Sequence, residues 1–95
     1  MKVVINGKEY TIVYSFRMYY VYESITGEMF TGATLLSMTV LFYSALLANN
    51  EEFPLTLEQF IDALDEDDSL LGNFKMFLTN EIEKRSLKKK EMANP

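Results

Sequence analysis

Four consecutive acidic residues, Asp-Glu-Asp-Asp at positions 65–68, resemble a metal site more than any other segment of this chain does. Clustered carboxylates suit calcium or magnesium, but a calcium-binding loop also needs a glycine at its sixth position and a glutamate at its twelfth. Counted from Asp65, these positions hold Leu70 and Met76. We therefore interpret the run as a solvated loop that caps a helix, and we expect no metal ion there.

Residues 27–34 have the glycine spacing of a phosphate-binding loop, in which a lysine and a serine or threonine follow the second glycine. The lysine of such a loop neutralises phosphate charge, and Ala33 stands in its place here. A predicted helix precedes the segment, whereas the motif follows a strand. We interpret the segment as a helix end and a loop, and we expect no cofactor.

Histidine and cysteine are both absent from the 95-residue sequence. A histidine-containing triad, a Cys/His zinc site and disulfide bonds are therefore impossible within this chain. The formal net charge of −5 argues against nucleic-acid binding, which relies on a basic surface. The composition, with 48% hydrophobic residues, favours one small folded domain without enzymatic activity that binds other proteins.

An uncharged stretch at residues 29–50 is predicted to contain a central helix at about residues 34–48, with Thr34 or Thr31 as its cap. This helix is apolar on nearly every side, so protein or lipid must surround it. The whole uncharged stretch at residues 29–50 reaches the length of a membrane span, but hydroxyl side chains dilute it and no basic residue flanks it. We therefore expect a buried helix and no membrane partner. The N-terminal residues also lack the long apolar run of a signal peptide.

The central helix carries two apolar stripes, which we assign to different neighbours. We expect Leu35, Met38 and Phe42 to face the domain's own hairpin and helices. We expect the second stripe to be shared with a second copy or another protein, together with tyrosines of the preceding helix, because tyrosine suits a half-buried interface. The candidate partner surface comprises Tyr19, Tyr20, Val40, Tyr43 and Leu47.

The N-terminal part of the chain is predicted to form a β-hairpin and a helix. The Asn-Gly pair at residues 6–7 predicts a hairpin over residues 2–14, because a type I′ turn needs positive φ at both central positions. Ser15 as N-cap and Gly27 as C-terminal stop bound a helix at about residues 16–26.

Local patterns also place the later helices. Asn49 and Asn50 are expected to end the central helix, since asparagine tolerates left-handed geometry. Thr56 and Gln59 form a predicted capping box that begins a short helix, and a final helix is expected at about residues 69–89. The predicted fold is α+β and mostly α, with an N-terminal β-hairpin packed on a small bundle of three to four helices. One domain would cover residues 1–83, and residues 84–95 would be a basic helix end or a frayed tail.

Charge is segregated in the second half of the chain. Residues 51–68 contain eight acidic and no basic side chains, whereas residues 84–90 contain five basic and no acidic ones. Solvated helix ends explain this pattern, because acids favour a helix N-terminus and bases a C-terminus. The alternative is a polar partner site or an arm that pairs with an acidic neighbour. The candidate polar contacts are Asp65, Glu66, Asp67, Lys84, Arg85 and Lys88.

Four motifs, taken in order, resemble those of a known family. They are an INGKEY hairpin at residues 5–10, S-F-R-x-x-Y-x-x-E-x-x-T-G at 15–27, an apolar helix ending A-L-L-A-N-N at 35–50, and T-x-E-x-F-x-D-A-L-D at 56–65. Together they are similar to the small tail assembly chaperones of long-tailed bacteriophages and prophages. The resemblance implies a non-enzymatic protein that coats the tape measure protein, keeps it soluble and helps to recruit tail tube subunits. It also implies self-association and a location in the cytoplasm of the bacterial host.

Two other classes of function stay open at the level of sequence. One is a structural virion component or head–tail adaptor that remains in the particle. The other is a small regulatory protein that binds other proteins. A repressor-like factor would need a basic recognition helix, and Arg17 is the only basic side chain in residues 16–50.

Overall fold

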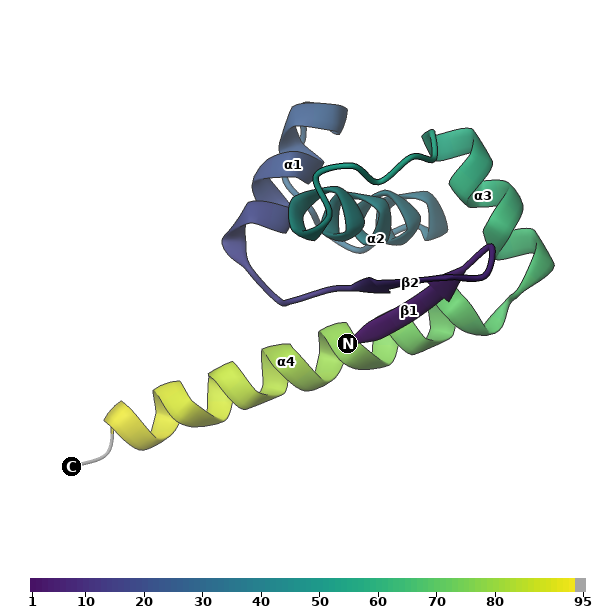
Figure 1. Ribbon diagram of the computed structural model, residues 1–95. Coiled ribbons are helices and arrows are strands. Elements are labelled where there is room, and N and C mark those ends of the chain that lie inside the picture. Colours follow the sequence, from purple (N-terminus) through teal and green to yellow (C-terminus); the bar gives the residue numbers. More distant parts are fainter. Residues whose placement is uncertain (94–95) are drawn as a thin grey trace.

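The computed structural model describes the backbone of residues 1–93 and the side chains of residues 1–87. In this part of the chain a β-hairpin is followed by four helices, which confirms the predicted α+β, mostly helical class (Figure 1). The elements are β1 (Lys2–Ile5), β2 (Lys8–Thr11), α1 (Phe16–Thr26), α2 (Leu35–Asn49), α3 (Leu57–Glu66) and α4 (Ser69–Ala93). Helix α2 lies at the centre, in contact with α1, α3, α4 and β2.

The hairpin forms around the predicted Asn-Gly turn, but its second strand ends at Thr11, short of the expected residue 14. Strands β1 and β2 pair antiparallel, with Val3 opposite Tyr10. The turn has positive φ at both Asn6 (52°) and Gly7 (79°), as a type I′ turn requires. Val3, Ile5 and Tyr10 are buried on one face of the hairpin, so this face packs on the helices.

Helix α1 begins after Ser15 and ends at Gly27, as predicted. Gly27 has a left-handed φ of 72°, and its N–H donates to the carbonyl of Glu23. Ser15 has the extended backbone of an N-cap residue, but its side chain makes no capping hydrogen bond. Met18 and Tyr22 are the buried residues of this helix, and they pack toward α2.

Helix α2 is capped by Thr34 through a reciprocal pair of hydrogen bonds. The Thr34 Oγ1 atom accepts from the Ser37 N–H at 3.0 Å, and the Ser37 Oγ atom accepts from the Thr34 N–H at 3.2 Å. The first turn of α2 is therefore held in helical geometry by its own side chains rather than by packing.

The C-terminal end of α2 differs from the prediction. Asn50 is extended, with φ of −137°, so no left-handed residue ends the helix. The Asn50 Nδ2 atom instead donates to the carbonyls of Leu46 (3.0 Å) and Thr11 (3.1 Å). Asn49 Nδ2 likewise donates to Ala45 O at 2.8 Å. Asparagine ends this helix by satisfying backbone carbonyls, including one on the hairpin.

Helices α3 and α4 complete the core around an aromatic cluster. The capping box of α3 is present, with Thr56 Oγ1 accepting from the Gln59 N–H at 3.2 Å. Phe42 of α2, Phe60 of α3 and Phe74 of α4 are fully buried, and Phe42 contacts both other rings.

Helix α4 extends beyond the other elements, so the molecule is elongated (Figure 1). Its longest dimension is 49 Å, against 28 and 25 Å in the other directions. In the described residues no helix combines the length and the apolar character needed to cross a bilayer. The basic segment at residues 84–90 belongs to α4, which continues to Ala93.

Candidate interaction groove

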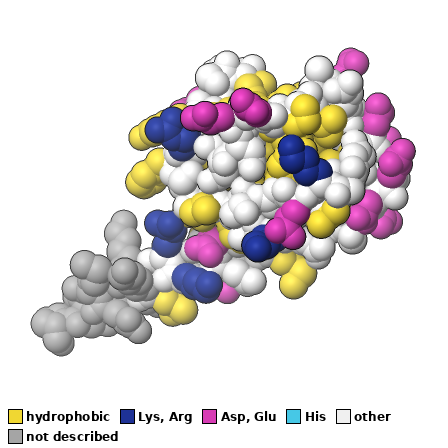
Figure 2. Space-filling view, in the orientation of Figure 1, with side chains coloured by type: hydrophobic (Ala, Val, Ile, Leu, Met, Phe, Trp, Pro, Cys, Tyr) yellow, Lys and Arg dark blue, Asp and Glu magenta, His cyan; other side chains and the backbone are white. Residues whose placement is uncertain are grey.

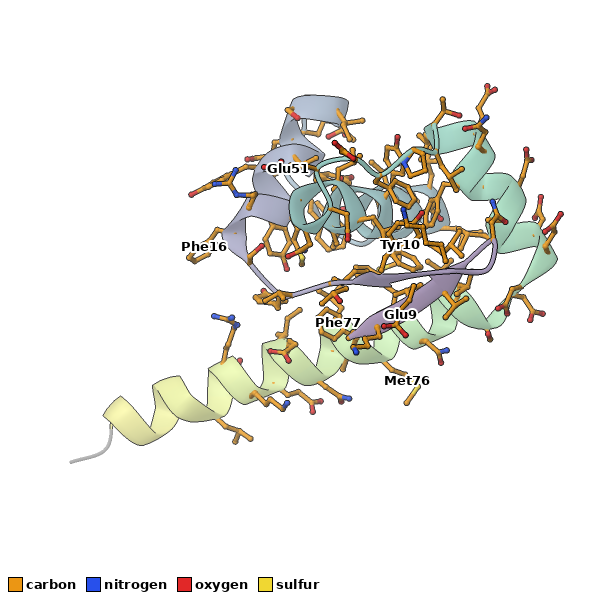
Figure 3. All side chains as sticks on the ribbon, viewed as in Figure 1. Glu9, Tyr10, Phe16, Glu51, Met76 and Phe77 are labelled. Atoms are coloured by element: carbon orange, nitrogen blue, oxygen red, sulfur yellow. The ribbon has the colours of Figure 1, made fainter. Side chains whose placement is uncertain are left out.

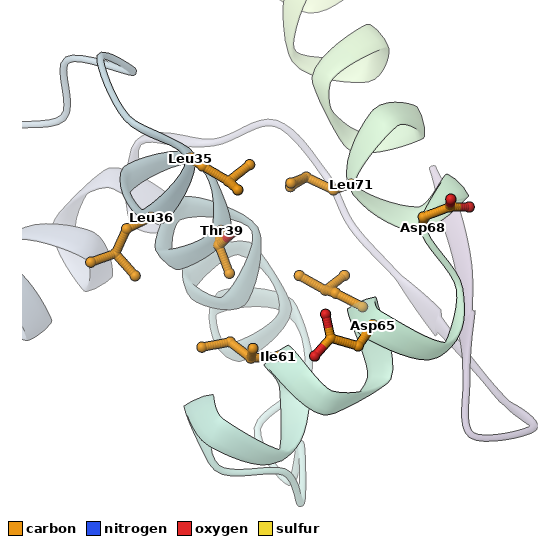
Figure 4. Close-up of a pocket in the computed structure, with 8 residues that line it drawn as sticks. Leu35, Leu36, Thr39, Ile61, Asp65, Asp68 and Leu71 are labelled. Atoms are coloured by element: carbon orange, nitrogen blue, oxygen red, sulfur yellow. The ribbon is translucent and has the colours of Figure 1, made fainter.

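A groove of about 500 Å³ opens between the first turns of α2, the outer face of α3 and the start of α4 (Figure 4). Leucine and isoleucine side chains form most of its wall, and two aspartates lie at its rim. The lining residues are Leu35, Leu36, Thr39, Ile61, Leu64, Asp65, Asp68 and Leu71. An open apolar groove with charge at its edge is typical of a site that takes an amphipathic helix.

The apolar wall of the groove is unusually accessible at the start of α2. Leu35 is 66% exposed and Leu36 is 61% exposed. The flanking helices pack on later turns of α2, where Val40, Leu41 and Phe42 are buried, and they leave the first turn open to solvent. The capping box described above holds this turn in place, so the two leucines are presented on a fixed backbone.

The rim of the groove carries charge on one side. Asp65 at the end of α3 and Asp68 before α4 line the groove and are exposed. The opposite wall belongs to α2, which contains no charged residue. In Figure 2 acidic side chains gather at the end of the molecule that α3 forms, while basic ones are spread over the rest of this face. The groove therefore favours a ligand that is apolar in the middle and basic along one flank.

A second hollow of about 350 Å³ lies on the other side of Leu36. It is formed by the end of α1, the following loop and the start of α2, and its lining is more polar. The lining residues are Tyr22, Thr26, Glu28, Met29, Thr31, Thr34, Leu36, Ser37 and Val40. Leu36 borders both hollows, so it forms the ridge between them.

The structure corrects the division of α2 into an inner and an outer stripe. Val40, predicted to be shared with a partner, is only 4% exposed. Leu35, predicted to face the domain's own core, is open to solvent, whereas Phe42 of the same stripe is fully buried. The reason is that burial on α2 changes along its axis: the first turn is uncovered, and the later turns are enclosed.

Tyr43 and Leu47 are used largely within the domain. The Tyr43 hydroxyl donates to Leu55 O at 2.8 Å, and its ring packs against Phe53 and Phe60. Burial raises the pKa of this phenol. Leu47 is half-buried against the core. Neither residue lines the groove among the side chains that the structure describes.

Tyr19 and Tyr20 lie on α1, apart from the described lining of the groove. Tyr20 is 66% exposed, and Phe16 one turn earlier is 73% exposed (Figure 3). Tyr19 is half-buried, with its hydroxyl 2.9 Å from that of Tyr14. Burial raises the pKa of Tyr19 and the hydrogen bond with Tyr14 raises it further, while the nearby Arg85 acts in the opposite direction. The predicted partner surface is therefore not one continuous patch.

The acidic members of the predicted polar site have different roles. Asp65 lines the groove, and Glu66 is exposed beside it at the end of α3. Asp67 is a cap: its Oδ1 atom accepts from the N–H and the hydroxyl of Ser69 at 3.1 and 2.6 Å. Asp68 lines the groove, as Asp65 does.

The basic members lie far along α4. Lys84 pairs with Glu81 at 3.8 Å on the surface, and the guanidinium of Arg85 lies 4.4 Å from the centre of the Tyr14 ring. The Lys88 side chain lies outside the described residues. The structure thus separates the acidic and the basic candidates along one molecule instead of joining them.

In the sequence, helical periodicity places Ile61 and Leu64 inward and Leu71 on the apolar stripe of the last helix, whereas Leu36 falls on the second stripe of the central helix. Leu64 and Leu71 are only half-buried, and Leu36 is exposed. Apolar spacing identifies the face of a helix but does not show whether another element covers it. One pattern could have indicated the site: the acidic run lies between two helices that both direct leucines toward the uncharged central helix.

Among the described residues no three histidine, cysteine, aspartate or glutamate side chains converge where they could hold a metal ion. The leucine wall of the groove offers contact to apolar groups, and Asp65 and Asp68 at its rim offer contact to basic groups. Comparison with protein-family models, curated proteins and solved structures gives no match.

Proposed function

We propose that this protein is a non-enzymatic assembly chaperone that holds an aggregation-prone helical client through the groove between α2, α3 and α4. The particular client that we propose is the tape measure protein of a phage or prophage tail, in the cytoplasm of the bacterial host. The motif resemblance to tail assembly chaperones supports this client. The tail tube protein would be a further partner.

The observation that carries the proposal is the exposure of Leu35 and Leu36 on the wall of the groove. Covering these two side chains with an apolar helix would contribute roughly 2–4 kcal/mol of binding free energy. The contact would be reversible, as a chaperone needs, because binding also has to offset the loss of translational and side-chain freedom.

The charge distribution supports the same role. A protein that offers apolar surface stays dispersed if its net charge is far from zero, and this chain carries −5. The acids at the rim would also select client segments in which lysine or arginine flanks a leucine-rich stripe.

The test is co-expression with the tape measure protein encoded by the same phage or prophage. We expect a soluble complex with the wild-type chain and mostly insoluble client without it. Leu35→Gln should reduce the recovered complex severalfold, because it removes apolar contact from the groove. Met76→Gln is the matched control: Met76 is 65% exposed, close to the 66% of Leu35, but points away from the body of the molecule (Figure 3).

Equal recovery of client with and without the chain would contradict the proposal. The structural alternative, a virion component or head–tail adaptor, predicts a different result in purified particles. Mass spectrometry should detect no stoichiometric amount of the chain there if it is a chaperone that leaves the assembly.

A further inference from the structure

We propose that the groove of one molecule also binds the basic end of α4 from a second copy, so that copies join head to tail. We define the basic end as residues 80–93, which continue α4 away from the other elements (Figure 1). The inference concerns the chain alone and requires no client.

Charge complementarity is the first argument. The groove is bordered by Asp65 and Asp68, within a stretch of eight acidic residues at positions 51–68. The basic end contains the five lysine and arginine residues of positions 84–90 against three glutamates, at positions 81, 83 and 91, so its formal charge is +2. Opposite patches on one molecule attract between copies, and the attraction weakens with salt.

Apolar complementarity is the second argument. Leu87 is 63% exposed on the basic end, and Lys84 precedes it by one turn on the same face of the helix. A helix laid in the groove can place Leu87 against Leu36 and Leu64 while Lys84 lies over the aspartates. The uncharged α2 wall makes no charge contact, so the acidic rim sets the orientation of the incoming helix.

The geometry of α4 makes this contact intermolecular. Leu71, at the groove, and Leu87, on the basic end, belong to one continuous helix. Their separation of 16 positions corresponds to about 24 Å along the helix axis. The basic end therefore cannot fold back into its own groove. Two different patches form the contact, and such heterologous contacts extend into chains or rings rather than closing as a symmetric dimer.

Sedimentation velocity of the purified chain tests the proposal. We expect average mass to rise with concentration at low salt and to fall toward the monomer at high salt. Two variants each remove one patch: Leu36→Gln with Asp65→Lys in the groove, and Lys84→Glu with Leu87→Gln on the basic end. Each should weaken association at least about tenfold. The Asp65→Lys change is at the end of α3, where a basic side chain is compatible with the helix.

Mixing the two variants gives the decisive result. One retains a working basic end and the other a working groove, so an equimolar mixture should form a 1:1 dimer that grows no further. A mixture that stays monomeric would overturn the proposal, as would a wild-type chain that is monomeric at all concentrations. Circular dichroism verifies that each variant is folded.

The control variant is Phe16→Gln with Arg17→Glu, which makes the same two kinds of change on α1. Both residues are exposed, and Phe16 is 73% exposed. Association of this control should equal that of the wild type. An equal loss in the control would place the contact on α1 and overturn the assignment. These measurements contain no client, so their outcome is independent of the co-expression test.

Discussion

The rings of Phe42 and Phe74 stack face to face, with centroids 4.5 Å apart and planes 1° from parallel. This contact joins α2 to α4 immediately below the groove, because Thr39 and Leu71 each lie one turn before the stacked residues and line the groove. The stack therefore fixes the distance between the two walls at the depth where the packed core ends and the open groove begins.

Replacement of Phe74 by alanine should destabilise the fold strongly. Phe74 is fully buried, and loss of its ring would leave a cavity beside Phe42, at a cost of about 3–5 kcal/mol. Urea denaturation followed by circular dichroism measures the loss. Met76→Ala, at a 65% exposed position of the same helix, should change the free energy of unfolding by less than about 1 kcal/mol. Similar losses in the two variants would contradict this role for the stack.

Asn50→Asp should destabilise more than Asn50→Ala. Alanine removes the Nδ2 bonds to Leu46 O and Thr11 O, worth about 1 kcal/mol each before allowance for solvent exposure. Aspartate removes the same donor and places a carboxylate against these carbonyls at a helix C-terminus, where negative charge is unfavourable. Thermal unfolding at neutral pH should give the order wild type, alanine, aspartate. The reverse order of the two variants would contradict the unfavourable effect of the carboxylate, and an Asn50→Ala variant as stable as the wild type would contradict the link that the amide makes between α2 and the hairpin.

Gly32→Ala should cost more than Gly27→Ala. Both glycines have φ of 72°, so each alanine bears the cost of left-handed backbone, roughly 1–2 kcal/mol. A Cβ atom at Gly32 would also lie 3.3 Å from Cζ of Phe30, whereas one at Gly27 would meet nothing within 4 Å. Denaturation of the two variants compares the costs directly. Equal costs would mean that the Phe30 ring moves aside freely.

Stability should fall in alkaline solution in a way that depends on Tyr19. Its pKa is raised in the folded protein, first by burial and then by the bond to Tyr14, so the folded state holds the phenol proton more tightly than the unfolded chain does. This contribution is complete below a pH of about 10, the ordinary pKa of tyrosine, and declines as pH rises toward the folded value.

Urea denaturation between neutral and alkaline pH measures this dependence. Tyr19→Phe should flatten the alkaline decline relative to the wild type. Tyr20→Phe is the control, since Tyr20 is 66% exposed on the same helix. A decline that is unchanged in Tyr19→Phe would contradict the role of Tyr19.

If the client and the basic end of a second copy both occupy the groove, they should compete. Addition of the client to preformed head-to-tail assemblies should lower the average mass of these assemblies, which light scattering can follow. Leu35→Gln should weaken both contacts together, whereas Lys84→Glu with Leu87→Gln should weaken only the contact between copies. An increase in assembly mass on adding client would show that the two use different surfaces.

Interactions between residues close in the chain specify the order of the elements and most of their ends. The Asn6-Gly7 turn, the stop at Gly27 and the capping box at Thr56 depend on φ preferences and hydrogen bonds within a few residues. Such local interactions are encoded in adjacent positions, so they can be recognised before the fold is known. The absence of cysteine and histidine likewise excluded whole classes of chemistry from composition alone.

Which side chains of α2 are exposed depends on how the other elements pack around it. On a helix that is apolar all round, periodicity cannot separate Leu35, which is open, from Val40, which is buried, because neighbouring helices cover some turns and not others. The amide of Asn50 meets the carbonyl of Thr11 across 39 positions of sequence, and no local rule predicts that contact. The groove has the same origin, because α2, α3 and α4 bring its walls together only when Phe42 and Phe74 have packed.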